Sequence, residues 1–113
     1  MDCLFCKIAT GDIPTKLIYE DKQIVAFNDI APQAPHHVLI IPRKHIATTN
    51  DLVAENNILI GDMMLVAKKI AASLNIADAG YRVLMNCNKN GGQAVYHIHF
   101  HLLGGRQMAW PPG

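Results

Sequence analysis

Three histidines alternate with apolar residues in one short segment, His97-Ile98-His99-Phe100-His101. Successive side chains of a β-strand point to opposite faces, so a strand here places the three imidazoles on one face and the two apolar side chains on the core side. With six histidines in 113 residues, random placement gives such a triplet in only about 2% of chains. The segment is therefore a candidate site of chemistry rather than ordinary structure.

Two kinds of chemistry fit three imidazoles on one face. Neutral imidazole nitrogens ligate transition metals. Imidazole is also a nucleophile, and flanking histidines can manage its protonation during a reaction. Chemistry at phosphorus favours the second interpretation, because the phosphorus–nitrogen bond that forms is labile enough for water to complete the turnover.

Composition narrows the classes of partner. The net charge of +1 gives no broad basic surface for nucleic acid. Half of the residues are hydrophobic and 17% are charged, which excludes a disordered chain. No uninterrupted apolar run approaches the roughly 18 residues that a membrane span needs. We expect a single domain over residues 1–113 that binds neither nucleic acid nor a membrane.

The elements that must position the histidines follow a strand–helix–strand order. We expect strands at 17–19, 23–27, 37–41, 81–87 and 96–103, and one long helix from Asp51, as N-cap, to about Asn75. The strand at 37–41 is expected to be buried on both faces. Segment 90–92 is expected to be a loop with unusual backbone angles, and the tail 108–113 to be neither helix nor central strand. This order predicts an α+β fold with a mainly antiparallel sheet.

Further segments resemble the histidine triad superfamily, and most closely its Hint branch. The matching segments are 27–35, His37, Ile41-Pro42, Gly91-Gly92-Gln93, 97–108 and Trp110-Pro111-Pro112-Gly113. The resemblance implies a five-stranded antiparallel sheet with one long helix, joined to the sheet of a second copy in a homodimer. It also implies a purine nucleoside phosphoramidate hydrolase that works through a nucleotidylated histidine and requires no cofactor for catalysis.

The resemblance also assigns roles to individual residues. His99 matches the nucleophile, His97 and His101 match the flanking triad members, and His37 matches a histidine that supports the nucleophile. The positions that match the nucleotide site are Phe5, Ile8, Phe27, Ile30 and Leu39 at the base, Asp29 at the ribose, and Asn86, Gly92, Gln93 and Ala94 near the phosphate, beside His99 and His101. Trp110 is expected to reach toward the partner's site, and His36 to be a surface or loop residue.

One position departs from the pattern of the branch. Members usually carry Ser after Gly-Gly-Gln, whereas this chain has Ala94. A hydroxyl near the phosphate or leaving group is therefore missing, although the backbone amide can still serve. This departure motivates a second hypothesis, a nucleotide-binding interaction protein whose catalysis is vestigial. A third hypothesis, a dinucleoside polyphosphate hydrolase or nucleotidyltransferase of the same superfamily, is disfavoured by the Trp-Pro-Pro-Gly tail.

Cysteines at positions 3 and 6 form a Cys-x-x-Cys pair, and no secretory leader precedes them. We therefore expect a cytoplasmic protein in which these residues are reduced thiols or metal ligands. Two thiolates with two histidines make a tetrahedral zinc set, and the resemblance matches His45 and His97 to those histidines. Such a zinc would be structural, because four protein ligands leave no open position. Cys87 is expected to be an ordinary half-buried strand residue.

Overall fold

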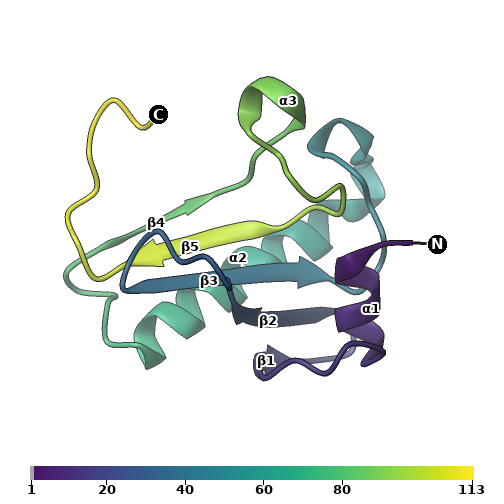
Figure 1. Cartoon of the computed structure of the whole chain (residues 1–113), viewed down its shortest axis with the longest axis horizontal. Helices are drawn as coiled ribbons and strands as arrows, with labels where there is room; N and C mark the ends of the chain where they lie inside the picture. The colour runs from purple at the N-terminus through teal and green to yellow at the C-terminus, as the bar shows by residue number, and fades with distance from the viewer. Residues whose placement is uncertain (1) are drawn as a thin grey trace.

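The computed structural model describes residues 2–113, which build one antiparallel sheet with the strand order β1-β2-β3-β5-β4 (Figure 1). The strands are β1 (Leu17–Glu20), β2 (Ile24–Asn28), β3 (His36–Pro42), β4 (Tyr81–Leu84) and β5 (Phe100–Gly104). The helices are α1 (Leu4–Thr10), α2 (Asn57–Ser73) and α3 (Asn88–Gly91), with 3-10 turns at Thr49–Asp51 and Ala54–Asn56. The expected α+β fold with a five-stranded antiparallel sheet is confirmed.

The central strands are buried on both faces because a helix packs on each side of the sheet. In β3, Val38 and Ile40 join the core under α2, whereas Leu39 and Ile41 join a second core with α1. β2 shows the same alternation. The period of two along a strand thus gives each face its own apolar set. This confirms the prediction that segment 37–41 is buried on both faces.

The long helix begins later than the sequence indicates. The expected start at Asp51 is wrong, because the Asp51 carboxylate accepts hydrogen bonds from the backbone N–H and hydroxyl of Thr48, 3.1 and 2.9 Å long, and closes a tight turn. A second turn follows, and α2 starts only at Asn57. Its buried face is the one that the periodicity predicts, with Met63, Val66, Ala67, Ile70 and Ala71 against the sheet.

The last strand is shorter than the expected 96–103. Residues 95–97 form a bend and residues 98–99 belong to no strand, and the Ile98 N–H donates to the carbonyl of Ile46 at 2.7 Å instead of to a strand neighbour. β4 likewise ends at Leu84 rather than at Cys87. The expected loop at 90–92 contains the end of the short helix α3, and the unusual backbone angle lies at Gly92, with a φ of 82°.

Helix α1 was not expected from the sequence. Cys3 caps its N-terminus by accepting a hydrogen bond from the Cys6 N–H, and Gly11 ends it with a φ of 85°. The helix buries Phe5 and Ile8 against the face of the sheet opposite α2. The tail 108–113 is neither helix nor strand, as expected.

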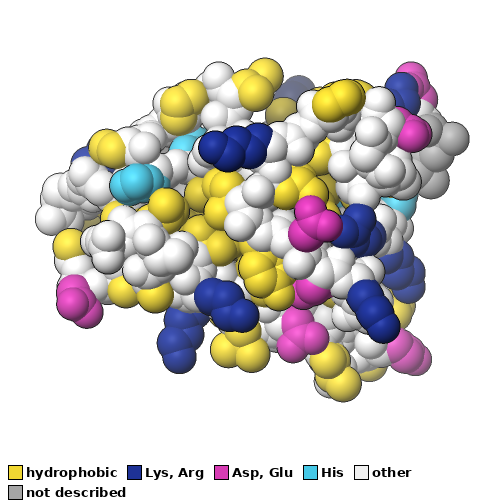
Figure 2. All heavy atoms as spheres, turned by 90° about the horizontal axis from the view of Figure 1, so that it is seen from below, with side chains coloured by type: hydrophobic (Ala, Val, Ile, Leu, Met, Phe, Trp, Pro, Cys, Tyr) yellow, Lys and Arg dark blue, Asp and Glu magenta, His cyan; other side chains and the backbone are white. Residues whose placement is uncertain are grey.

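The surface carries both signs of charge. On the face seen in Figure 2, Lys and Arg side chains are interspersed with Asp and Glu and with apolar atoms, so that face has no single basic patch. Within residues 2–113 no helix combines the length and the hydropathy that a membrane span requires.

Candidate active site

A cavity of about 580 Å³ opens on the face of the sheet opposite α2. The β3–β5 register pairs Leu39 with His101, so both side chains point to this face, whereas Phe100 and Leu102 point into the core under α2. Of the predicted residues, the cavity is lined by Phe5, Ile8, Phe27, Asp29, Ile30, Leu39, Asn86, Gly92, Ala94, His99 and His101. The structure therefore brings most of the predicted nucleotide site together.

His99 is held in one tautomer by the backbone. Its Nδ1 lies 2.8 Å from the carbonyl oxygen of His97, and a carbonyl only accepts hydrogen bonds, so Nδ1 carries the proton. Nε2 then has a free lone pair, and the ring lines the cavity. Burial lowers the pKa of His99, which keeps the imidazole neutral and nucleophilic near pH 7. The ring of Phe5 meets it edge-on at 5.1 Å between centroids.

Hydrogen bonds also fix the protonated nitrogens of His37 and His101. The backbone N–H of Gln33 donates to His37 Nδ1 at 3.0 Å, so His37 carries its proton on Nε2. That N–H donates to His101 Nδ1 at 2.8 Å, which leaves the proton of neutral His101 on its own Nε2. Asp29 lies 3.5 Å from the same His37 nitrogen and accepts the Ala31 N–H. The supporting histidine thus sets the tautomer of its neighbour.

Only His101 of the three histidines lies on a strand, which corrects the expectation of a regular triplet along one strand. β5 begins at Phe100, and the preceding bend turns the fully buried His97 ring so that Nε2 donates to the Pro42 carbonyl at 2.7 Å. Nδ1 is left as an acceptor. The carbonyl of His97 accepts the hydrogen bond from the nucleophile.

The Nδ1 atom of His97 lies close to the other three predicted zinc ligands, Cys3, Cys6 and His45. It lies 3.4 Å from Cys3 Sγ, 3.5 Å from Cys6 Sγ and 3.2 Å from His45 Nδ1. Zinc bonds of 2.3 Å to sulfur and about 2.05 Å to nitrogen give tetrahedral edges of about 3.6 Å for S···N and about 3.3 Å for N···N. The four side chains therefore already have the spacing of zinc ligands. Within residues 2–113 no disulfide joins any of the cysteines.

Gln93 was expected to lie in a loop whose backbone donors approach the phosphate, but its backbone and side chain make hydrogen bonds within the protein. Its backbone N–H donates to the Asn88 carbonyl, and the neighbouring Gly92 N–H donates to Lys89, so neither donor is open to a phosphate. The buried side chain of Gln93 accepts the Asn88 N–H and donates to two further carbonyls, those of Ala47 and Val95. It fixes the loop, and along the described chain no hydrogen bond engages the N–H of Ala94, which lines the cavity.

Two other predicted residues differ in their surroundings. Ile30 is fully exposed at the mouth of the cavity. Trp110 is 83% exposed and does not line the cavity of its own chain. The lining residues that the sequence reasoning missed are Leu4, Ile13, Pro14, Thr15, Asn28 and Val95. Four of them lie on or just after α1, and the apolar spacing of Leu4, Phe5 and Ile8 was the available signal for that helix.

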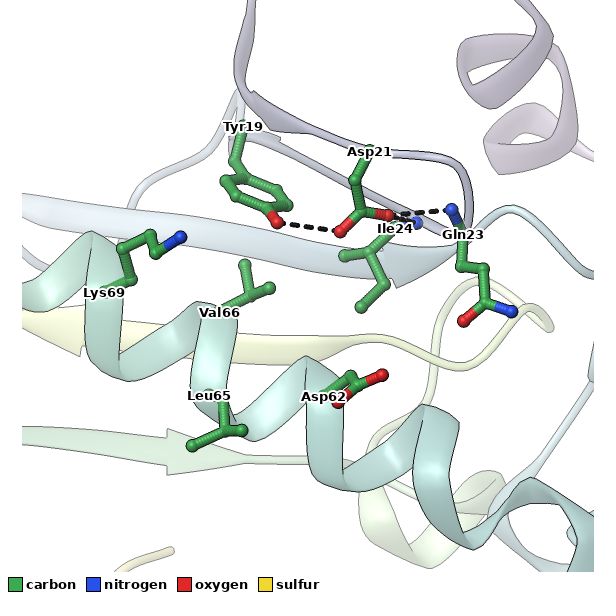
Figure 3. Close-up of a pocket in the computed structure, with 8 residues that line it drawn as sticks. All are labelled: Tyr19, Asp21, Gln23, Ile24, Asp62, Leu65, Val66 and Lys69. Atoms are coloured by element: carbon green, nitrogen blue, oxygen red, sulfur yellow. Dashed lines mark hydrogen bonds between the residues drawn. The ribbon is translucent and has the colours of Figure 1, made fainter.

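A smaller hollow of about 180 Å³ lies between the β1–β2 turn and α2 (Figure 3). Figure 3 shows the Tyr19 hydroxyl and the backbone nitrogens of Gln23 and Ile24 directed at Asp21. The Asp21 carboxylate therefore closes a turn. None of the predicted site residues lies there.

Acid should destabilise the protein through His101. Burial and then the positive charges of His99 and His37 lower the pKa of His101 from 6.5 to about 4. The unfolded chain takes up this proton near pH 6.5 and the folded chain only near pH 4, so stability is lost as pH falls through this window, by about 2 kcal/mol between pH 7 and 4.5. Urea unfolding at both pH values measures the loss. His101→Gln should reduce it; an unchanged pH dependence in this variant contradicts the assignment.

The sequence is similar to proteins of one known family. The model of the HIT domain matches residues 10–108. The chain is 51% identical over 107 residues to the purine nucleoside phosphoramidase of Escherichia coli K12, which covers 95% of this chain and 90% of that protein. It is 48% identical over 112 residues to an uncharacterized HIT-like protein of Synechococcus elongatus, covering 99% of this chain and 97% of that one.

Solved structures give the same result. A HIT family hydrolase from Legionella pneumophila superposes with a TM-score of 0.97 at 57% identity, covering 99% of this chain and 100% of that one. A histidine triad nucleotide-binding protein from Candida albicans superposes with a TM-score of 0.81 at 35% identity, covering 97% and 83%. The chain therefore belongs to the HIT, or histidine triad, family.

Proposed function

We propose that this protein hydrolyses the phosphorus–nitrogen bond of purine nucleoside 5′-phosphoramidates and releases the nucleoside monophosphate. The observation that carries the proposal is the His99 imidazole, whose Nδ1 proton is tied to the His97 carbonyl while Nε2 is free at the cavity. The name of the Escherichia coli relative, purine nucleoside phosphoramidase, supports the same reaction.

The cavity suits a nucleotide because one part of its lining is apolar and another part carries polar side chains. Phe5, Ile8, Phe27 and Leu39 are all at least nine-tenths buried and form an apolar wall for a planar base. The Asp29 carboxylate at the edge can accept hydrogen bonds from the two ribose hydroxyls. Asn86, Ala94 and His101 then surround His99, where the phosphate belongs. The site thus orders base, sugar and phosphate toward the nucleophile.

The reaction follows as a double displacement. His99 Nε2 forms a bond to phosphorus, and the bond from phosphorus to the amine breaks; the amine leaves with a proton that its nitrogen has taken from solvent. Water then forms a bond to phosphorus and gives one proton to solvent, and the bonding pair returns to Nε2. The His101 Nε2–H and the Ala94 N–H are donors for the phosphoryl oxygens as charge develops.

A second candidate, nucleotide binding with vestigial catalysis, is favoured by Ala94 alone. A methyl side chain supplies no hydroxyl at the cavity wall. The hydrogen-bonded tautomers of the histidines do not depend on that hydroxyl, which is why we place hydrolysis first.

Replacing the nucleophile tests the reaction. Purified protein should release AMP from an adenosine 5′-phosphoramidate, and His99→Ala should lower that rate by at least about 10³-fold, because His101, the other imidazole that lines the cavity within residues 2–113, carries its proton on Nε2. His36→Ala, which removes a histidine outside the cavity, is the matched control and should keep the rate. Tight AMP binding by a wild-type protein without hydrolysis would instead establish the vestigial alternative.

We also propose that Cys3, Cys6, His45 and His97 hold a structural zinc ion. Their spacing supports this, and so does the His97 Nε2–H bond to the Pro42 carbonyl, which directs a bare Nδ1 at the thiols. The four ligands would tie α1 to the segment after β3, which carries His45, and to the segment before β5, which carries His97. The cytoplasm, where thiols stay reduced, is the compartment that we propose.

Metal analysis tests the zinc site. Protein prepared without chelator should contain about one zinc per chain, and Cys3→Ser should lose most of it together with thermal stability. Cys87→Ser removes a thiol outside the set and should retain the metal. Far less than one equivalent in the wild type contradicts the proposal.

Finally, we propose a homodimer in which Trp110 approaches the site of the partner. The outer edge of β4 has no strand neighbour among the described residues, and Ile58, Met64 and Leu65 expose apolar surface on α2. The exposed indole on the tail is a further apolar surface without contacts to its own cavity.

Sedimentation equilibrium at micromolar concentration should give twice the chain mass. Leu65→Lys, which places a charge on exposed apolar surface, should shift the population toward monomer, whereas Lys22→Ala on the β1–β2 turn should not. A wild-type monomer across the concentration range rules the dimer out.

A further inference from the structure

Arg106 bridges the strand that carries His101 to the loop that holds His37. It lies two residues beyond the end of β5. Its Nε and Nη2 donate to the same carbonyl, that of Gln33, at 3.1 and 2.9 Å. Two donors from one planar guanidinium define the position of that carbonyl more closely than a single hydrogen bond does. The contact is therefore a clamp on the loop between β2 and β3.

The Gln33 residue held in this way also holds His37. Its carbonyl accepts the Arg106 bonds, and its N–H is the donor to His37 Nδ1 at 3.0 Å. The backbone of Gln33 thus links the exposed Arg106 to the buried imidazole of His37. Since His37 Nε2–H donates to His101, the chain of hydrogen bonds runs from Arg106 to the wall of the cavity.

Asp29 restrains the start of the loop, where its N–H donates to the His37 carbonyl and its carboxylate accepts the Ala31 N–H, but the tip of the loop has few other restraints. Residues 31–33 are exposed and belong to no strand or helix, and the Gln33 side chain donates only to the Ala31 carbonyl in the same loop. The contact continues at Gly105, where an added Cβ would lie 2.9 Å from Pro35. The two residues that follow β5 are therefore both packed against the loop.

We infer that Arg106 is a positioning residue for the hydrolysis, acting through the Gln33 backbone to hold His37, and through it His101, in a single tautomer. The inference rests on the proposed function for its kinetic consequence. The tautomers themselves are independent of the reaction. Arg106 does not line the cavity, and Asp29, which does, is also held by its own N–H bond to the His37 carbonyl, so the loss of Arg106 should change turnover more than nucleotide affinity.

The test combines kinetics with nitrogen NMR of histidine-labelled protein. In the wild type, the His37 signals should show a bare Nδ1 and a protonated Nε2. In Arg106→Gln, these signals and those of His101 should move toward averaged tautomers, kcat should fall about fivefold or more, and the Kd for AMP should change less than about twofold. Arg106→Lys, which keeps the charge and a donor, should recover part of both readouts.

Arg43→Gln is the matched control, because Arg43 also donates to two backbone carbonyls, those of Asp21 and Ala9, away from this loop. It should keep the wild-type tautomers. Wild-type His37 signals and turnover in Arg106→Gln would overturn the inference. If that variant does not fold, the same signals in Arg106→Lys decide. A wild type that hydrolyses no phosphoramidate contradicts the proposed function alone, since the tautomer signals still test the clamp.

Discussion

The hydrogen bond from His99 Nδ1 to the His97 carbonyl is the interaction on which the site depends. An imidazole in water exchanges its proton between two nitrogens, and only the unprotonated nitrogen attacks phosphorus. The backbone acceptor assigns that proton to Nδ1 and leaves Nε2 at the cavity. Because the same carbonyl belongs to a residue whose ring faces the Cys/His set, the nucleophile and that set share one fixed segment of chain.

Two features of the fold position the segment 97–101: the register between β3 and β5, and the bend that precedes β5. Pairing of β3 with β5 puts His101 on the open face, and the turn away from β3 before Phe100 frees the His97 carbonyl and ring for different partners. α1 then covers part of the open face with Phe5 and Ile8, which forms the apolar wall and lowers the pKa of His99 by burial. Packing on two faces of one sheet thus separates the core under α2 from the chemistry.

Much of this could be predicted because it rests on local pattern. The alternating histidines, the run at 37–41 and the helical period near Met63 each depend on spacing alone. The bend before Phe100 could not be predicted, since it results from bonds to Ile46 and Pro42 that are distant in sequence. α1 is short and buries few residues, so its pattern was weak. The bonds of Gln93 could not be predicted either, because its side chain donates to Ala47, which is distant in sequence.

The most direct measurement is the position of the covalent intermediate. Protein mixed with an adenosine phosphoramidate, quenched in alkali within one turnover and digested, should give a single peptide with the added mass of an AMP group, carried by His99 and with phosphorus bonded to Nε2. An adduct on His97, His101 or His37, or AMP release with no adduct at any time, would contradict the account.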